Sequence, residues 1–349
     1  MMKEPTTTVP KKIQMNEDTF ISIVIPVYNG EKTVDVCLKS VFSSDYKRFE
    51  FIVVDDNSTD NSLRIVNDFP CKVVRTGKNI GPAAARNRGA EASSGEVLFF
   101  LDSDIIVARD TIRQIVKAFK DIPDISALFC SYQKNTVPSN FYSVYKNLFH
   151  YYTHQTSRED AATFCGGFGA IKRNVFFRLG GFNENYKSLE DIELGYRLYQ
   201  SGYKIYLDKN IRLTHCKKYN LLSLIKSDVI NRAIPWTKIM LDKRIFRNDL
   251  NTKVNNVLSV PVSFLLLFNL PGLYFFSGGL YLFVLLFGFF LLLNRGFYIF
   301  VMREKGISFT IKAILMNWFN YLYSGVGLII GILSFLKESR LRSKPQSCT

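Results

Sequence analysis

The sequence predicts an α/β domain built on a mainly parallel sheet, followed by a C-terminal helical membrane module. Short apolar runs alternate with helical patterns between Ile21 and Leu101, which is typical of βαβ units. Acidic residues nearly vanish from about Val254 onward, where Leu, Phe, Ile, Gly and Tyr dominate. A chain of 349 residues is long enough for one sizeable domain and an appendage of this kind.

The elements of the sheet domain follow in a regular order. Four buried-type apolar runs predict strands, at 21–26, 51–54, 71–75 and 97–101. Helical spacing of apolar residues predicts helices between them, at about 31–43, 60–69 and 81–91. The last of these helices is entered through Gly81-Pro82, a typical helix start. Further along, 204–208 and 211–215 read as strands.

Acidic residues follow two of these strands directly. Asp55 and Asp56 come after the second strand, and Asp102-Ser103-Asp104 comes after the fourth. An open α/β sheet places its ligand-binding loops at this edge, and carboxylates there suit a divalent cation and a sugar-phosphate donor. The alternative is that these residues only form turns, which Asp, Asn and Ser also favour.

Four runs resemble a known family, in the family's own order. These runs are 23–29, 54–60, 79–87 and the Asp102-Ser103-Asp104 triplet, and together they resemble the family 2 inverting glycosyltransferases of the type A fold. A lone Asp-x-Asp would carry little weight, but the four motifs extend across roughly residues 20–216. The resemblance implies a nucleotide-diphosphate sugar donor, a divalent cation (Mn²⁺ or Mg²⁺) and transfer with inversion at the anomeric carbon.

The resemblance also assigns donor-binding residues: Pro26, Tyr28, Asp55, Asp56, Arg86, Asp102 and Ser103. Asp56 would accept a hydrogen bond from the nucleotide base, with Asp55 as the second choice. Asp104 is the first choice as metal ligand, because carboxylate oxygens suit Mg²⁺ and Mn²⁺. Asp102 would then lie nearer the ribose or the sugar. Arg86 could reach a phosphate or could equally be a solvated arginine on a helix face.

A second group of residues points to the acceptor. The adjacent glycines Gly166 and Gly167 allow close approach of the backbone to a ligand, and the family places such a segment beside the acceptor and the donor sugar. Glu190 and Asp191 open an apolar-periodic run, at a predicted helix start. Inverting transfer needs a base that takes the acceptor's hydroxyl proton, and Asp191 is the predicted base, with Glu190 beside the acceptor. Alternatively, both acids only cap the helix.

The histidines and cysteines add one further site residue. His215 matches a family position that completes the metal site in several relatives, although a structural role is equally open. His150 and His154 stay unassigned. The six cysteines show neither CxxC spacing nor a dense framework, which favours a reduced compartment and no functional role.

The C-terminal half predicts contact with a membrane. Residues 221–241 mix apolar and basic side chains, as in a helix that lies in the membrane interface. Within them, 231–236 departs from the Gln-x-x-Arg-Trp signature of processive relatives, which disfavours a processive synthase. The apolar stretches 254–276, 278–293 and 311–335 are candidate spans. The basic residues that flank these stretches favour the cytoplasmic side. The chain could therefore cross the membrane twice, with a re-entrant or interfacial last segment, or it could cross three times.

The expected organisation has five parts: a polar tail at 1–19, the catalytic domain at 20–216, an interfacial linker at 217–253, transmembrane helices at 254–336 and a basic tail at 337–349. The net charge of +15 is scattered and lies mainly beside apolar segments, which favours anionic lipids over nucleic acid as partner. The first 19 residues lack the apolar core of a signal peptide, so the catalytic domain of this multi-pass protein is expected in the cytoplasm.

These observations predict a metal-dependent membrane-bound glycosyltransferase. Its acceptor would be a polyprenyl-phosphate or a lipid-linked saccharide in cell-surface polysaccharide or glycolipid synthesis, or alternatively a diacylglycerol or other glycolipid precursor. From a different class, the chain could be an inactive nucleotide-sugar-binding scaffold subunit of a membrane polysaccharide assembly complex. The presence of both Asp104 and Asp191 argues against a scaffold.

Overall fold

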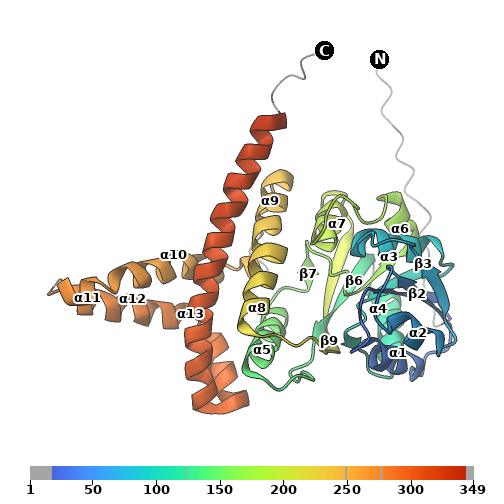
Figure 1. The fold of residues 1–349 in the computed structure, drawn as a ribbon, viewed down its shortest axis with the longest axis horizontal. Helices are drawn as coiled ribbons and strands as arrows, with labels where there is room; N and C mark the ends of the chain where they lie inside the picture. The colour runs from blue at the N-terminus through green and yellow to red at the C-terminus, as the bar shows by residue number, and fades with distance from the viewer. Residues whose placement is uncertain (1–17, 123, 248–249, 276, 343–349) are drawn as a thin grey trace.

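The computed structural model describes residues 18–122, 124–247, 250–275 and 277–342. Most of the tails expected at 1–19 and 337–349, and Cys348, lie outside these residues. The described residues form a sheet domain and a helical module that projects from one side of it (Figure 1).

The sheet has the strand order β3-β2-β1-β4-β8-β6-β9-β5, with β7 beside β9. The first four strands in this order pair in parallel: β1 (Ile21–Val27), β2 (Phe49–Asp55), β3 (Lys72–Arg75) and β4 (Val97–Leu101). Their residues are almost continuously apolar because helices cover both faces of the sheet. The predicted α/β fold with a mainly parallel sheet is therefore confirmed.

The other strands extend the sheet toward the helical module. β8 (Phe168–Lys172) runs antiparallel between β4 and β6 (Ile125–Tyr132). The two strands expected at 204–208 and 211–215 are one strand, β9 (Lys204–His215), which pairs in parallel with β6. Two short strands, β5 (Ile105–Ile106) and β7 (Asp160–Ala161), both pair with β9.

Seven helices connect the strands: α1 (Val34–Phe42), α2 (Ser62–Asn67), α3 (Pro82–Glu91), α4 (Thr111–Asp121), α5 (Phe141–Gln155), α6 (Arg173–Arg178) and α7 (Glu190–Gln200). The first three match the predicted helices, but α1 begins later than 31, after a turn at 31–33 in which the N–H groups of Thr33 and Val34 both bond the carbonyl of Gly30. α3 packs on β1 and β2, and α5 packs on β6 and β9.

A bent helical segment joins the sheet domain to the module. It consists of α8 (Leu221–Asp228), a π-helical turn η1 (Val229–Ala233) and α9 (Ile234–Lys243). Pro235 lies just after the turn, and its missing N–H interrupts the regular α-helical hydrogen bonding there. η1 and α9 pack against the last helix, α13.

The C-terminal helices form an arm and a long helix across its base (Figure 1). The arm contains α10 (Val254–Asn269), α11 (Gly272–Phe275) and α12 (Gly279–Leu293). α13 (Arg295–Arg342) is interrupted at Gly306, whose φ is 79°. Within the described residues, only α13 is long and apolar enough to cross a bilayer, because α10 and α12 have 16 and 15 residues. A crossing needs roughly 20.

Polar side chains connect the module to the sheet domain through its apolar core. The hydroxyl of Tyr145, on α5, donates to Asn317 Oδ1 on α13 at 3.1 Å. Asn317 in turn donates to Asn294 and to the hydroxyl of Tyr298. Because these groups are buried, each hydrogen bond fixes the relative position of its two elements.

Candidate functional site

The acids after β2 differ in how far they are engaged by the protein itself. The Asp56 carboxylate accepts hydrogen bonds from the N–H groups of Ile80 and Gly81 and from the Thr76 hydroxyl, each at 2.9 Å. Asp56 therefore holds the loop that enters α3. Asp55 is buried as well, but its Oδ2 has no hydrogen-bond partner among the described residues. The nearest cation to this oxygen among the ion pairs of the described residues is Arg75, whose Nε lies 3.8 Å away.

The loop after β1 carries further residues of the predicted donor site. Tyr28 lies just beyond β1 and is 52% exposed, whereas Pro26 lies within the strand opposite Val54. Ser103 packs against Gly30, where a Cβ would lie 3.2 Å from the serine Oγ. The predicted base-binding residues therefore lie close together along β1 and β2 and just beyond their carboxyl ends.

Arg86 joins the donor side of the site to the acceptor side. Its Nη2 donates to Asp102 Oδ1 at 2.6 Å, and its Nη1 donates to Glu190 Oε1. The side chain is only 6% exposed. Arg86 is therefore buried rather than solvated, and each of its terminal nitrogens donates to a carboxylate. It neutralises and orients two acids that belong to distant parts of the sequence.

The paired glycines allow these acids to approach the backbone. A Cβ on Gly167 would lie 2.5 Å from Asp102 Oδ2, and a Cβ on Gly166 would lie 3.0 Å from the Asp191 Cβ. The Gly166 N–H donates to Asp191 Oδ2 at 2.8 Å, and the Asp102 N–H donates to the Gly167 carbonyl at the same distance. Gly166 and Gly167 therefore form the contact between Asp102 and Asp191.

Asp191 lies in the first turn of α7, as predicted. Burial raises the pKa of Asp191 above its ordinary value, and the hydrogen bond from Gly166 and the charge of Arg86 oppose this shift. Neighbouring Glu190 differs, because it is buried and paired with Arg86. Of the two acids, Asp191 is therefore the one without a cationic partner in direct contact within the described residues.

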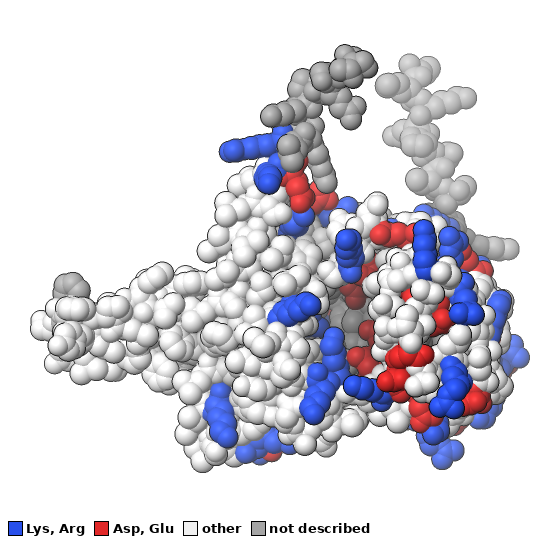
Figure 2. All heavy atoms as spheres, in the orientation of Figure 1, with Lys and Arg blue, Asp and Glu red and all other residues white. Residues whose placement is uncertain are grey.

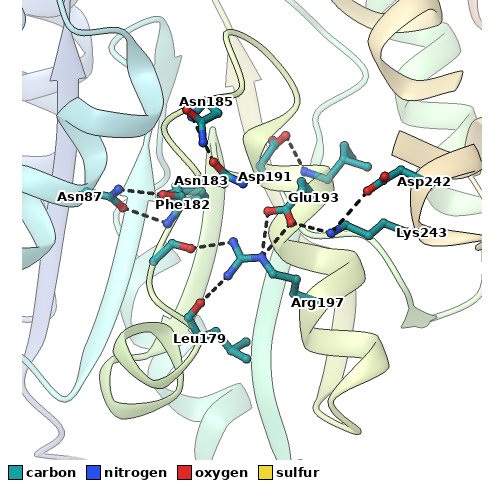
Figure 3. Close-up of polar contacts among 12 residues, drawn as sticks. Asn87, Leu179, Phe182, Asn183, Asn185, Asp191, Glu193, Arg197, Asp242 and Lys243 are labelled. Atoms are coloured by element: carbon teal, nitrogen blue, oxygen red, sulfur yellow. Dashed lines mark hydrogen bonds and ion pairs between the residues drawn. The ribbon is translucent and has the colours of Figure 1, made fainter. Parts of the chain in front are cut away.

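A second set of contacts attaches α7 to the loop at 179–182 (Figure 3). Glu193 pairs with Arg197 one turn later, and Arg197 donates to the carbonyls of Leu179 and Gly181. The Asn87 amide bonds both the N–H and the carbonyl of Phe182, which attaches the same loop to α3. These contacts position the N-terminus of α7 relative to α3 and so position Asp191 relative to Arg86.

Asp104 and His215 are brought together by strand pairing. β5 and β9 pair antiparallel with Ile105 opposite His215, which places His215 Nε2 3.6 Å from Asp104 Oδ2. Burial lowers the pKa of His215 and raises that of Asp104, while each partner opposes the shift of the other. His215 is consequently neutral near pH 7, the form that binds a metal.

Asp104 and His215 could bind a cation whose other ligands come from the substrate. Two bonds of about 2.1 Å span at most about 4.2 Å, so one cation can reach both atoms. No group of three or more His, Cys, Asp or Glu side chains in the described chain is arranged to hold a metal. A site with two protein ligands suits Mg²⁺ or Mn²⁺, which commonly complete their coordination with substrate phosphates and water.

A hollow lies between the sheet domain and the helical module (Figure 2). Figure 2 shows red acidic atoms around this hollow and blue basic atoms on its module side, whereas the arm is white on the visible face. Several residues that position α7 had no predicted role. Asn87 belonged to a motif run without an assignment, and Glu193 and Arg197 gave no signal because an i, i+4 ion pair is common on any helix.

This fold and site define a class of protein: an α/β transferase domain. Acidic residues at the sheet edge and beside the paired glycines can bind an activated sugar. The sequence model described as Glycosyl transferase family 2 matches residues 22–180. An uncharacterized glycosyltransferase of Haemophilus influenzae is 30% identical over 230 residues, covering 62% of this chain and 76% of that protein. The chain belongs to glycosyl transferase family 2, which confirms the predicted family.

Other similarities are more local or concern the fold. The poly(ribitol-phosphate) beta-glucosyltransferase of Bacillus spizizenii is 39% identical over 100 residues, covering 26% of this chain and 16% of that protein. The solved structure of mannosyltransferase PcManGT from Pyrobaculum calidifontis, in complex with GDP-Man and Mn²⁺, has a TM-score of 0.59 at 17% identity. The match covers 95% of this chain and 91% of that one, and it confirms the type A fold.

Proposed function

We propose that this chain is a membrane-associated, metal-dependent inverting transferase that moves a sugar from a nucleotide-diphosphate sugar to a lipid-linked acceptor. The observation that carries the proposal is the continuous contact from Asp102 through Arg86 and the Gly166-Gly167 pair to Asp191. This contact joins the donor edge of the sheet to a carboxylate that can act as a base. Such a connection has no purpose in a module that only binds a nucleotide.

In the proposed mechanism Asp191 takes the proton of the acceptor hydroxyl while the acceptor oxygen attacks the anomeric carbon. The bond to the leaving diphosphate breaks on the opposite face, so the configuration inverts. A raised pKa brings the Asp191 carboxylate closer to the operating pH and improves it as a base. Arg86 holds the carboxylates of Asp102 and Glu190 in place, and Glu190 then lines the acceptor side.

Asp104 and His215 would hold the divalent cation. When bound, the cation supplies positive charge that offsets the negative charge growing on the leaving diphosphate. PcManGT carries Mn²⁺ and GDP-Man in its solved structure, which supports Mn²⁺ or Mg²⁺ as cofactor here. Asp55 and Tyr28, with Pro26 and Ser103 beside them, would form the nucleotide side of the site.

The acceptor is proposed to come from the membrane. No charged residue occurs between Val254 and Asn294, and aromatic side chains near the tip of the arm are largely exposed. α10 is about 24 Å long, less than the roughly 30 Å hydrocarbon core. We propose that the arm enters the bilayer from the cytoplasmic side. It would form either a hairpin that crosses a locally thinned bilayer twice or a re-entrant hairpin, with α13 near the interface.

A groove lies between this module and the loop that precedes α7. It has about 1440 Å³ of empty space, including its open mouth, and lies between the loop before α7 and the helices α9 and α13. Its lining mixes apolar side chains such as Ile234 and Phe335 with polar and charged ones such as Asn183 and Lys238. An acceptor with an apolar chain and a polar reacting end, such as a polyprenyl-phosphate, suits this mixed lining. It also suits a role in cell-surface polysaccharide or glycolipid synthesis.

Donor hydrolysis by the purified full chain tests the proposed activity. We expect slow, metal-stimulated release of nucleoside diphosphate from one or a few nucleotide sugars, because water can replace a missing acceptor. A screen of UDP- and GDP-sugars with Mn²⁺, Mg²⁺ or chelator would measure it. Binding of a nucleotide sugar without any turnover, even with added lipid acceptors, would instead indicate the scaffold function.

A further inference from the structure

A cavity lies at the base of the arm, where α10 begins and α12 is followed by α13. The space in it that is open to water molecules is about 260 Å³, whereas a single buried water needs roughly 10–15 Å³. One face of α5, at 149–156, forms the opposite wall. No acidic side chain is among its described lining residues, and none of these residues lines the groove proposed for the acceptor.

A buried polar network fixes the inner wall of this cavity. The hydroxyl of Tyr321 lies 3.0 Å from Asn256 Oδ1, in the first turn of α10, and 2.8 Å from Asn294 Oδ1, just before α13. Asn294 Nδ2 also donates to Ser259 Oγ at 3.0 Å. Because satisfied buried networks are rigid, the cavity is a preformed space between fixed helices.

Two hydroxyl groups of α5 reach the cavity without a hydrogen-bond partner among the described residues. Thr153 is only 5% exposed and lies on the face of α5 that lines the cavity. Tyr152 precedes it, and its ring stacks on Phe300 of α13 at 5.6 Å. A Cβ on Gly296 would overlap the Tyr152 hydroxyl, so a glycine is needed there for this hydroxyl to keep its place. Buried tyrosine hydroxyls usually have a partner, and both hydroxyls are available to a ligand.

Lys253 brings positive charge to the same wall. Its Nζ donates to Thr156 Oγ1 at 2.7 Å and to the Thr153 carbonyl at 3.3 Å, which places the ammonium beside the α5 face. Leu293 and Phe297 add apolar surface to the lining. The cavity therefore combines a cation, hydroxyl donors and apolar walls, which suits an anion that is part of an amphipathic molecule.

The position of the cavity indicates a membrane lipid as this molecule. The arm is formed by 254–294, which contain no charged residue, and the cavity lies where both ends of the arm meet the rest of the protein. With the arm inserted as proposed above, this point lies at the level of the lipid headgroups. Basic pockets between membrane helices bind anionic headgroups in this way.

We infer that this cavity binds the headgroup of an anionic glycerophospholipid, with Lys253 beside the phosphate and the hydroxyls of Tyr152 and Thr153 donating to its oxygens. Hydrogen bonds from an ammonium to a phosphate are charge-assisted and strong. The inference rests on the membrane insertion in the proposed function, and it adds a lipid site separate from those of the donor and the acceptor. The bound lipid would fix the base of the arm at the bilayer surface.

Binding of short-chain lipids to the full chain in detergent micelles tests this site. The probes are dihexanoyl phosphatidylglycerol, dihexanoyl phosphatidylcholine and the water-soluble glycerol 1-phosphate. Lys253→Gln should weaken phosphatidylglycerol binding at least about tenfold, and Tyr152→Phe and Thr153→Val at least about threefold each. The matched controls Lys312→Gln and Tyr281→Phe should bind it as the wild type does, because both residues are exposed on the module and do not line the cavity.

Unchanged phosphatidylglycerol affinity in the three cavity variants, or an equal loss in Lys312→Gln, overturns the site. Equal wild-type affinity for phosphatidylcholine overturns the preference for an anionic lipid, and equal affinity for glycerol 1-phosphate assigns the cavity to a soluble phosphate ester instead. If Lys253→Gln fails to fold, Tyr152→Phe and Thr153→Val must still show their losses.

Donor hydrolysis separates this inference from the proposed function. It should be unchanged in the cavity variants, since none of these residues belongs to the proposed catalytic site. Phosphatidylglycerol binding through Lys253 in a wild-type chain that turns over no nucleotide sugar would refute the proposed transfer but not the lipid site. Normal donor hydrolysis without any phosphatidylglycerol binding would refute the lipid site alone.

Discussion

Two adjacent carboxylates at the start of α7 have different surroundings, and this difference predicts their roles. Glu190 is ion-paired with buried Arg86, whereas Asp191 accepts hydrogen bonds only from backbone N–H groups in the described structure. Asp191→Asn keeps the shape but cannot accept a proton. We expect turnover to fall by about 10²- to 10⁴-fold while donor affinity persists.

Steady-state kinetics and nucleotide-sugar binding check this prediction together. Glu190→Gln is the control, and it leaves a hydrogen-bonding partner for Arg86. It should cost less turnover than Asp191→Asn. An active Asp191→Asn variant with a larger loss in Glu190→Gln would assign the base to Glu190 and make Asp191 a helix cap.

The pKa of Asp191 also predicts a pH dependence. Asp191 is a base only when ionised, and burial raises its pKa above the ordinary value of about 3.9. The acid limb of kcat/KM should therefore lie above that pH. The effect on stability runs the other way, because the folded chain binds the Asp191 proton more tightly than the unfolded chain. Asp191 therefore contributes to folding stability at low pH, and this contribution is lost as the pH rises through the raised pKa. A pH profile with no acid limb above about pH 4 would contradict the assignment.

Asp104 and His215 meet only through the β5–β9 pairing, and both are predicted to hold the cation. Asp104→Asn should lower apparent Mn²⁺ affinity at least about tenfold, because even outer-shell partners of a metal cause such losses. Metal-dependent UDP or GDP binding and activity should fall together while the unfolding midpoint changes little. Full wild-type activity in excess chelator would disprove the metal role of this pair.

At the scale of elements, the ion pair behind α7 holds the catalytic helix in place. Glu193 is 1% exposed and contacts both Arg197 and, at 3.4 Å, Lys243. Arg197→Met leaves this carboxylate with one partner and removes two bonds to the 179–181 loop. We expect a loss of about 2 kcal/mol in the free energy of unfolding, measured by denaturant titration.

The double variant Glu193→Gln with Arg197→Met is the matched comparison. It removes the buried charge along with its partner, so it should lose less stability than Arg197→Met alone. A double variant that is as unstable as the sum of the two single variants would show that the pair is not coupled.

At the scale of the whole molecule, the arm is expected to attach the sheet domain to a bilayer. Tyr274, Phe275 and Tyr281 are 87%, 73% and 80% exposed near its tip. Replacing all three with Ser should weaken binding to anionic vesicles at least about tenfold, since each buried aromatic contributes about 1.5–3 kcal/mol. Donor hydrolysis should be unchanged, because the tip is remote from the sheet (Figure 1).

Vesicle flotation of the full chain measures this effect. Val137→Ser with Phe177→Ser is the control, since both residues are exposed apolar residues of the sheet domain. It should leave flotation unchanged. Equal flotation of the arm variant and the wild type would show that another surface of the protein, such as the apolar face of α13, binds the membrane.

Much of this protein was determined by local sequence. The β1–β4 and α1–α3 elements could be predicted because each carries its own period of apolar residues, and the acids follow strands whose carboxyl ends must meet at one edge. Asp102, Asp104 and Asp191 could be chosen because their motifs occur in order along the chain. Both the fold class and the family follow from these local signals.

Only the tertiary structure decided which of these residues touch. Arg86 and Glu190 are 104 residues apart, and no local pattern predicts that they pair. The engagement of Asp56 by the α3 loop, the meeting of Asp104 with His215 and the cavity at the base of the arm likewise depend on strand order and helix packing. Local periodicity specifies an element, but the partner of a buried charge is set by long-range contacts between elements, which no single segment encodes.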